Sequence, residues 1–319
     1  MMSHSNATRI NNFYILGFPG LLAENEGPVS ALLFLIYAFI VAGNILIITI
    51  VSLERSLHKP TYLIFCHLAF TDLVYGTVIL PKIISKYWFD NGLISYYGCF
   101  TQMYFVHFLG ATHSFILMVM ALDRFVAICA PFHYPRFITN TTITALCAIS
   151  WFVPIAWMVG VVCHALTLLY CGPNEIQLCY CDHITITRLA CESARAVQIV
   201  AFILAMISLL LPLAFIFFSY VFIIVAVVKM SSSDGRTKAL STCTPQLFIT
   251  CLYYMPRCFV YLANNVGFTF SDPVRIIVIM MYSVLPAAVN PVIYCFKTKE
   301  IKETLKKRLN KRKATVNLF

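Results

Sequence analysis

The sequence predicts an all-α membrane protein: a bundle of seven transmembrane helices followed by a short amphipathic C-terminal helix. Three observations support this fold class. Of the 319 residues, 60% are hydrophobic and only 11% are charged, against about 25% in an ordinary soluble domain. Seven apolar stretches are long enough to cross a bilayer, which takes about 20 residues. Lysine and arginine gather in the segments that lie at one end of such a bundle.

The composition also excludes several classes of protein. A soluble enzyme, a disordered chain and a disulfide-dense miniprotein do not fit a sequence that is so apolar and carries so few charges. The formal net charge is +10, and residues 297–319 hold nine Lys/Arg and two Glu. Because this positive charge forms a tail beside a membrane span, it indicates a cytoplasmic anchor on anionic membrane lipid, and no nucleic-acid-binding surface.

The seven stretches divide the chain into three parts. Residues 1–28 are expected to form an extracellular N-terminus, residues 29–296 the seven-transmembrane domain, and residues 297–319 a basic cytoplasmic tail. The fourth and fifth stretches exceed one span, so each is expected to include a helix extension or a loop. The stretches cover residues 29–51, 61–81, 98–122, 141–170, 196–228, 239–263 and 276–296.

The distribution of basic residues predicts the orientation in the membrane. With the tail inside, the inner segments hold fifteen Lys/Arg, whereas the outer segments and adjoining helix ends hold seven. This bias predicts an extracellular N-terminus and a cytoplasmic C-terminus. The first 28 residues show no signal-peptide pattern, so the first span is expected to insert by itself. Asn6-Ala-Thr8 is a glycosylation sequon on the predicted outer side.

The tail is expected to begin as a helix on the membrane surface. Ile301, Leu305 and Leu309 recur at four-residue spacing with lysines between them, which is typical of an interfacial amphipathic helix. Beyond about residue 310 a disordered basic tail is expected.

The cysteines fall into two groups. Eight of the thirteen lie in or near spans and are interpreted as small apolar fillers. The five on the predicted outer side favour two disulfides and one spare thiol. A metal site at Cys179-Tyr-Cys-Asp-His183, with His164 nearby, is the alternative, although a structural zinc site usually needs four well-spaced ligands. The outer cysteines are Cys99, Cys171, Cys179, Cys181 and Cys191.

Charged and polar residues inside the apolar spans are the first functional signals. The third span ends in Met120-Ala-Leu-Asp-Arg-Phe-Val-Ala-Ile-Cys129, and an Asp-Arg pair in a lipid helix is costly enough to indicate a function. The seventh span ends in Pro286-Ala-Ala-Val-Asn-Pro-Val-Ile-Tyr294, where proline permits a kink. Three further polar groups are expected to satisfy one another: Asn44, Asp72 and Asn290.

In order along the chain, these motifs resemble a rhodopsin-like G-protein-coupled receptor, and more specifically the odorant receptor family. The string MALDRFVAICAPFHYP at 120–135 is similar to the most diagnostic segment of that family. LHKPTY at 57–62, SY at 219–220 and KALSTC at 238–243 resemble its other signatures, and the long second outer loop has its cysteine spacing. The resemblance covers nearly the whole chain. GFPGL at 17–21 leans toward the class I branch.

The resemblance implies the function and the partners. A member of this family binds a small odorant in the outer half of the bundle and activates a stimulatory olfactory G protein, which raises cAMP. It is a receptor in the plasma membrane of olfactory cilia, with no enzyme activity and no cofactor, and helper proteins for its export are plausible partners. The implied disulfides are Cys99–Cys181 and Cys171–Cys191, which leaves Cys179 as a spare thiol.

The resemblance also assigns residues to activation. The Asp123-Arg124 pair is implied to hold the inactive state. On activation, Arg124 is implied to be released toward the G protein. Tyr220 and Tyr294 are implied to support the open inner cavity, and Lys238 to lie at the G-protein face. Asn290 and Pro291 belong to the same seventh-span motif as Tyr294.

The sequence departs from the family pattern at three positions. Thr61 replaces a usual Met, and Gln246 replaces a usual His of the sixth-span signature. His113 replaces the Glu that would join an acid such as Asp72 around a sodium ion, so no sodium site of the usual kind is expected. A neutral His113 that bonds Asp72 or a backbone group is the expectation.

Helical spacing predicts the residues that face the ligand. His107, Gly110, Ala111 and Ser114 share one face of the third span, and Tyr254, Arg257 and Tyr261 share one face of the sixth. The fifth span adds a mostly apolar wall that includes Ala201 and Ala205, and His183 is expected over the mouth. The predicted ligand-binding residues are His107, Gly110, Ala111, Ser114, His183, Ala201, Ala205, Tyr254, Arg257 and Tyr261.

Arg257 is the most informative residue of this set. An arginine keeps its proton, and no acid lies within a turn or two of it in sequence. The hypothesis is that Arg257 points inward and pairs with a carboxylate-bearing odorant, helped by His107 or Arg275. The alternative is that it extends outward to the membrane surface or bonds loop carbonyls and Tyr261.

Other classes of membrane protein fit less well. Transporters show paired broken spans in two repeated halves, and channels show filter loops or charged rings. Neither pattern is present in the sequence, and no reacting constellation of a membrane enzyme is present. An amine receptor needs an acid in the outer third span, where Val106, His107 and Phe108 stand instead. A peptide receptor would be expected to carry a long acidic N-terminus.

Overall fold

The computed structural model describes residues 10–171, 173–265 and 271–316, and gives only the backbone for residues 261–265, 296, 297, 299, 309 and 311–316. The predicted glycosylation site Asn6 lies outside this described part.

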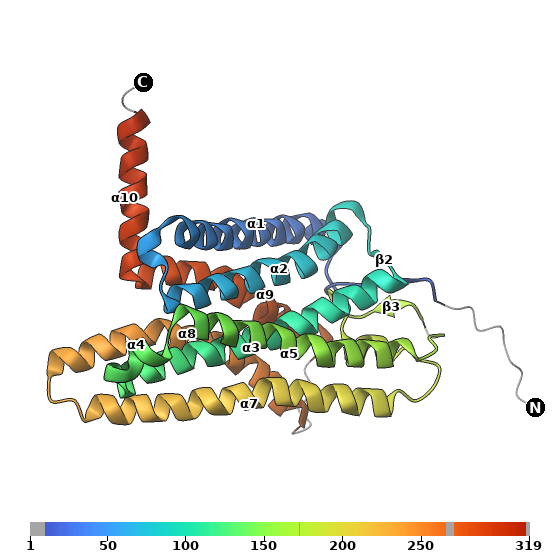
Figure 1. The fold of residues 1–319 in the computed structure, drawn as a ribbon. Helices are drawn as coiled ribbons and strands as arrows, with labels where there is room; N and C mark the ends of the chain where they lie inside the picture. The colour runs from blue at the N-terminus through green and yellow to red at the C-terminus, as the bar shows by residue number, and fades with distance from the viewer. Residues whose placement is uncertain (1–9, 172, 266–270, 317–319) are drawn as a thin grey trace, which may run out of the picture.

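Long helices dominate the described chain and confirm the predicted seven-helix bundle (Figure 1). The shortest has 26 residues, or about 39 Å of helix, enough to cross a hydrocarbon core of about 30 Å. Six are apolar enough to span a membrane by length and composition. The long helices are α1 (Ala23–Leu53), α2 (Pro60–Phe89), α3 (Tyr96–Cys129), α5 (Asn140–Leu166), α7 (Arg195–Val228), α8 (Ser233–Asn265) and α9 (Asp272–Lys297).

The helix bounds differ from the apolar stretches because polar turns add to each span. α1 begins at Ala23, ahead of the expected boundary at residue 29. The polar first turns of α8 begin at Ser233, so the loop after α7 is shorter than expected. α5 ends at Leu166, and the following residues form a loop. The fifth stretch is one continuous helix of 34 residues.

A small β-sheet, which the sequence did not predict, lies at one end of the bundle. β1 (Asn12–Ile15) pairs with β2 (Leu93–Ser95) in antiparallel fashion and with β3 (Glu175–Ile176) in parallel, in the order β2-β1-β3. Phe13 and Ile15 of β1 are fully buried. The sheet therefore fastens the N-terminal segment to two loops, and we call this end of the bundle the sheet end.

The opposite end carries α10 (Lys299–Val316), and we call it the α10 end. α10 crosses the end of the bundle past α1 and does not continue along α9 (Figure 1). Ile301 is fully buried against the bundle, and Arg308 lies 3.8 Å from the Glu54 carboxylate. The expectation of disorder after about residue 310 was wrong, because α10 runs to Val316.

Short elements complete the two ends. The 3-10 helices Arg55–Leu57 and Pro131–His133 and helix α4 (Tyr134–Phe137) lie between spans at the α10 end. Helix α6 (His183–Thr187) lies in the loop before α7. The Asp182 side chain caps α6, because it accepts hydrogen bonds from the N–H groups of Ile184 and Thr185.

The bundle is packed internally and apolar externally. Large side chains such as Phe152, Phe217 and Leu211 point outward, as expected of helices that are solvated by lipid. Between α1 and α9 the contact is close at Gly43, where a Cβ atom would lie 3.0 Å from Pro291. The glycine of the Gly43-Asn44 pair is therefore what lets α1 approach the proline of α9.

Candidate functional site

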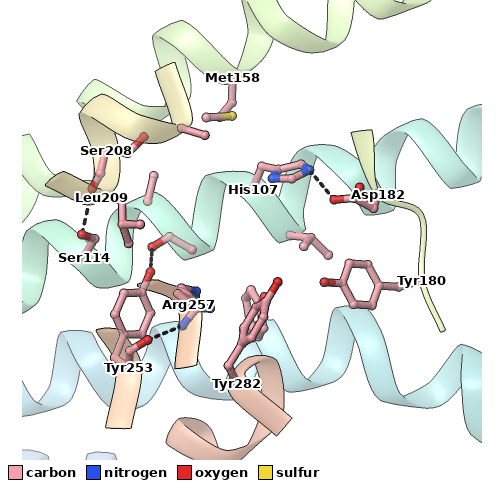
Figure 2. Close-up of a pocket in the computed structure, with 15 residues that line it drawn as sticks. His107, Ser114, Met158, Tyr180, Asp182, Ser208, Leu209, Tyr253, Arg257 and Tyr282 are labelled. Carbon is pink, nitrogen blue, oxygen red and sulfur yellow. Dashed lines mark hydrogen bonds and ion pairs between the residues drawn. The ribbon is translucent and has the colours of Figure 1, made fainter. Parts of the chain in front are cut away.

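A cavity of about 110 Å³ lies between the helices toward the sheet end (Figure 2). Helix α3 supplies one wall and α7 the neighbouring wall. Tyrosines from α2, α8, α9 and the loop before α6 close the remaining sides. The described residues that line it are Tyr75, Val106, His107, Gly110, Ala111, Ser114, Met158, Tyr180, Asp182, Ala205, Ser208, Leu209, Tyr253, Arg257 and Tyr282.

The structure brings six of the ten predicted ligand-binding residues to this cavity. The whole predicted face of α3 lines it, because residues at helical spacing of three, four and seven share a face. A Cβ atom on Gly110 would meet nothing within 4 Å, so this glycine leaves the cavity open. That these residues bind a ligand stays a prediction. The six are His107, Gly110, Ala111, Ser114, Ala205 and Arg257.

Three other predicted residues do not line the cavity, and the side chain of Tyr261 is not among those described. Tyr254 is buried, with its hydroxyl 2.5 Å from that of Ser114. Its neighbour Tyr253 faces the cavity instead, because one residue rotates a helix position by about 100°. Ala201 lies one turn of α7 before Ala205 and does not reach the lining.

His183 is the third predicted residue that does not line the cavity. Its ring is buried and lies edge-on to the His107 ring, with 6.5 Å between the centroids. Asp182, one position earlier, faces the cavity in its place. Burial, with the nearby charges of His107 and His164, lowers the pKa of His183 to about 4. The neighbouring Asp182 acts in the opposite direction.

Arg257 is the only described arginine or lysine that lines the cavity, and it is 9% exposed. Its Nη1 donates to the backbone carbonyl of Tyr253 at 3.1 Å. The guanidinium lies over two aromatic rings, 3.9 Å from the centroid of Tyr253 and 4.7 Å from that of Tyr282. Among the described residues, no carboxylate lies within 4.0 Å of it. Its head therefore points into the bundle, away from lipid.

Asp182 and His107 form the second polar group of the cavity (Figure 2). Nε2 of His107 lies 3.4 Å from Oδ1 of Asp182 and 3.4 Å from the backbone nitrogen of His183. Burial opposes ionisation of Asp182. The hydrogen bond and charge of His107, with smaller contributions from His183 and the Thr185 N–H, nevertheless hold its pKa below its ordinary value. Asp182 is thus a carboxylate at neutral pH.

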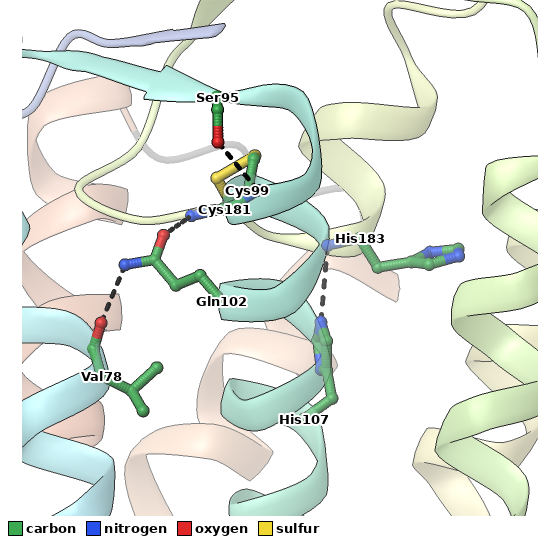
Figure 3. The surroundings of a disulfide bond; sticks show 8 residues. Val78, Ser95, Cys99, Gln102, His107, Cys181 and His183 are labelled. Atoms are coloured by element: carbon green, nitrogen blue, oxygen red, sulfur yellow. Dashed lines mark hydrogen bonds between the residues drawn. A yellow bond between two sulfur atoms is a disulfide. The ribbon is translucent and has the colours of Figure 1, made fainter. Parts of the chain in front are cut away.

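The Cys99–Cys181 disulfide positions the loop that carries Asp182 (Figure 3). Gln102 of α3 accepts the Cys181 N–H at 2.9 Å and donates to the Val78 carbonyl of α2 at 2.9 Å. The implied Cys171–Cys191 disulfide is also present, and Cys179 is free and buried. Among the described residues no cluster of three metal-ligating side chains forms.

A buried polar cluster lies next to the cavity, toward the α10 end. His113 Nδ1 lies 3.2 Å from Asp72 Oδ1, and Asn290 donates to Asp72 Oδ2 at 2.7 Å. The His113 ring also stacks on Tyr253, at 4.5 Å between centroids. Asn44 does not join this cluster as expected. Its amide nitrogen donates to two backbone carbonyls, and its Oδ1 is buried with no hydrogen-bond partner in the described part of the chain.

A second constellation lies at the α10 end of α3. The Asp123 carboxylate accepts hydrogen bonds from Arg124 at 2.6 Å, from Thr61 at 3.1 Å and from Tyr134 at 2.8 Å. Arg124 also donates to Thr61 at 2.8 Å. Sequence reasoning found the charged pair but missed Thr61 and Tyr134 as its partners. The sequence held one signal of the Thr61 contact, namely a threonine at a position where the family usually has Met.

The other residues assigned to activation surround this constellation. Tyr220 and Tyr294 are buried, and their hydroxyls have no hydrogen-bond partner in the described part of the chain. The ring of Tyr294 stacks on Phe65 at 4.3 Å. Lys238 is exposed at the same end of the bundle.

Together, the seven helices, the cavity near one end and the buried Asp-Arg pair near the other have the architecture of a seven-helix membrane receptor. The sequence model of the family described as "Olfactory receptor" matches residues 33–312. Olfactory receptor 6P1 of Homo sapiens is 34% identical over 310 residues, which are 96% of this chain and 96% of that protein. Olfactory receptor 1E16 of Mus musculus is 35% identical over 321 residues, 99% of this chain and 100% of that protein.

The chain therefore belongs to the olfactory receptor family. The family and the apolar helices make it an odorant-sensing G-protein-coupled receptor, a multi-pass protein of the plasma membrane and not an enzyme. The leaning toward the class I branch stays a prediction.

Proposed function

We propose that the cavity at the sheet end binds a small odorant and that ligand binding there opens the α10 end to a stimulatory G protein. The observation that carries the proposal lies on one helix. α3 lines the cavity with His107 to Ser114 and then presents the Asp123-Arg124 pair about two and a half turns beyond Ser114. A shift of α3 that accommodates a ligand is thus transmitted along a rigid element to the charged pair.

The odorant class that fits the cavity carries a carboxylate. Arg257 is a desolvated cation whose described neighbours are rings and one carbonyl. A guanidinium binds a carboxylate through charge-assisted and often paired hydrogen bonds. Arg257 has already lost its hydration on burial, at a cost in free energy. A contact with a ligand anion compensates this cost of burying the Arg257 charge.

The closed Asp123-Arg124 pair fits a resting state of the receptor. Arg124 is held by Asp123 and Thr61 and is not available to a partner. Activation would break these bonds, expose Arg124, and move Tyr220 and Tyr294 toward it. Their hydroxyls, which have no hydrogen-bond partner among the described residues, would then form hydrogen bonds. Lys238, Asn290 and Pro291 lie on the two helices, α8 and α9, that would move with them.

The orientation follows from the same proposal. The sheet end, with both disulfides, is extracellular, because disulfides persist in an oxidising compartment, and residues 1–28 are then the extracellular N-terminus. The α10 end is cytoplasmic, with the basic face of α10 on anionic lipid. Residues 29–296 form the receptor domain and residues 297–319 the tail. Olfactory cilia are the expected location, and buried charged groups such as Asp72 make assistance from export chaperones plausible.

The proposal is tested by cAMP production in cells that carry this chain, the olfactory stimulatory G protein and an export helper. Matched carboxylic acids, amines, alcohols and aldehydes are applied. A ligand-dependent rise is expected, which Arg124→Ala abolishes and which Arg136→Ala, an exposed arginine of α4, preserves. A response that survives Arg124→Ala, or a ligand-driven current that needs no G protein, would contradict the proposal.

A further inference from the structure

The ligand cavity holds one positive and one negative group, and each is aimed at its interior (Figure 2). Arg257 supplies the positive charge, and its described surroundings contain no carboxylate within 4.0 Å. Asp182 supplies the negative charge, and its partners are an imidazole and backbone N–H groups. Asp182 and Arg257 are not paired with each other, since no ion pair joins them among the described residues.

The two charged groups lie at different depths along α3. The hydroxyl of Tyr253, over whose ring Arg257 lies, donates to the Gly110 carbonyl at 2.6 Å. Asp182 contacts His107, which is three residues, about 4.5 Å of helical rise, nearer the sheet end. A ligand that reaches both groups must therefore span about one turn of helix.

The space between the two groups is small, and the wall that α3 gives it there is apolar. Gly110 and Ala111 line it and offer no polar side-chain atom. The cavity volume is about 110 Å³. A dry cavity of about 150 Å³ accommodates benzene, so this one has room for about four or five non-hydrogen atoms. A short alkyl chain with a polar group at each end is at the upper limit of these dimensions, and a longer chain must widen the cavity.

We infer that the preferred ligands of this receptor are short linear zwitterions, with the carboxylate on Arg257 and an ammonium group on Asp182. The inference rests on the proposed role of the cavity and deepens it by naming the second polar group of the ligand. A zwitterion places an opposite charge on both groups, whereas a simple acid leaves Asp182 with His107 as its side-chain partner and a simple amine leaves Arg257 without an anion. The ammonium group donates to Asp182 Oδ1, the oxygen that faces His107.

The test compares compounds of one chain length: 4-aminobutanoate, butanoate, butylamine and 1-butanol. Two readouts are used. One is cAMP in cells with verified surface expression, and the other is the ligand-induced shift of the thermal unfolding temperature of the purified receptor in lipid nanodiscs. The second readout reports binding without any G protein. The expected result is a half-maximal concentration for 4-aminobutanoate at least about tenfold below that for butanoate, since each charge-assisted hydrogen bond is strong in a desolvated site.

Two variants separate the two ends of the ligand. Asp182→Asn keeps a side chain that caps α6 but removes the charge. It is expected to raise the half-maximal concentration of 4-aminobutanoate at least about tenfold and to leave that of butanoate unchanged or lower. Arg257→Gln is expected to weaken both acids and to make butylamine the better ligand. Glu192→Gln removes a negative charge and Arg188→Gln a positive charge from exposed positions of the loop that carries Asp182. Both control variants are expected to leave the half-maximal concentrations of 4-aminobutanoate and butanoate unchanged.

The outcomes distinguish this inference from the proposal beneath it. Butanoate as potent as 4-aminobutanoate, or equal loss of both in Asp182→Asn, overturns the zwitterion inference. A response to a neutral odorant from the wider panel with no response to 4-aminobutanoate overturns it also, and leaves the receptor function standing. If a surface-expressed receptor responds to nothing on the panel and no compound shifts its unfolding temperature, the zwitterion inference and the proposed ligand-binding function are both refuted.

Discussion

The buried His183 makes the stability of the receptor depend on pH in a way that one substitution removes. The ring lies in α6 at the sheet end, almost fully buried, and neither ring nitrogen has a hydrogen-bond partner in the described part of the chain. Burial and the nearby His107 and His164 lower its pKa from 6.5 to about 4, while Asp182 partly opposes them. Because the folded protein binds the proton less readily than the unfolded chain, acid favours unfolding.

The size of the effect follows from the two pKa values. Above pH 6.5 both states hold a neutral ring, and the full stability is present. As the pH falls from 6.5 toward 4, the unfolded chain gains a proton that the folded protein resists. At pH 5 the loss reaches about 2 kcal/mol, since each pKa unit is worth about 1.4 kcal/mol. For a chain of this length that corresponds to about 3 °C in the unfolding temperature.

The assay is thermal unfolding of the purified receptor in nanodiscs at pH 7 and pH 5, for the parent chain and for His183→Leu. Leucine keeps an apolar side chain of similar size in the site and cannot take up a proton. The decrease between the two pH values is expected to be about 3 °C smaller in His183→Leu than in the parent. His133→Leu, an exposed histidine at the α10 end, serves as the matched control and is expected to behave as the parent. Equal decreases in parent and His183→Leu would refute the reasoning.

Two further predictions concern the α10 end and the helix contacts. Tyr134→Phe removes the 2.8 Å hydrogen bond to Asp123. Because a hydrogen bond to a charged group contributes about 1.5–3 kcal/mol, its loss should weaken the resting state and raise ligand-independent cAMP severalfold. An unchanged basal cAMP signal at equal surface expression would contradict this prediction. Gly43→Ala places a Cβ atom 3.0 Å from Pro291 and should destabilise the receptor by about 1–3 kcal/mol. Gly160→Ala, where a Cβ atom meets nothing within 4 Å, should leave the stability unchanged. The unfolding temperatures of both variants test this, and equal decreases in the two would contradict the close contact at Gly43.

The residue types and their spacing were sufficient for the fold class and for one side of the cavity. Apolar length predicted the membrane spans, because a bilayer leaves few alternatives to a helix of about 20 residues. Helical periodicity placed His107 and Ser114 on one face of α3, and both line the cavity. The charged Asp123-Arg124 pair was found because charge is rare and costly in such a helix.

Other residues of the candidate site were not predictable from the spacing. Tyr75, Tyr180 and Tyr282 come from three different elements, and no periodicity within one helix shows which other helices approach it. Tyr254 and Tyr253 were exchanged because a sequence pattern does not fix the rotation of a helix to within one residue. Asn44 does not meet Asp72, because backbone carbonyls accept the hydrogen bonds of a buried amide nitrogen as well as side chains do.

The sequence by itself determined that this chain is a seven-helix membrane protein, which family it resembles, and which face of α3 is open. These are properties of single segments, set by hydropathy and by the 3.6-residue period. Only the tertiary structure decided that Asp182 faces the cavity and His183 does not, because the Cys99–Cys181 disulfide and Gln102 fix the path of that loop. It alone placed Arg257 among aromatic rings with no acid within 4.0 Å in the described chain. Which charges remain available to a ligand is set by contacts between distant segments, and local sequence carries no record of them.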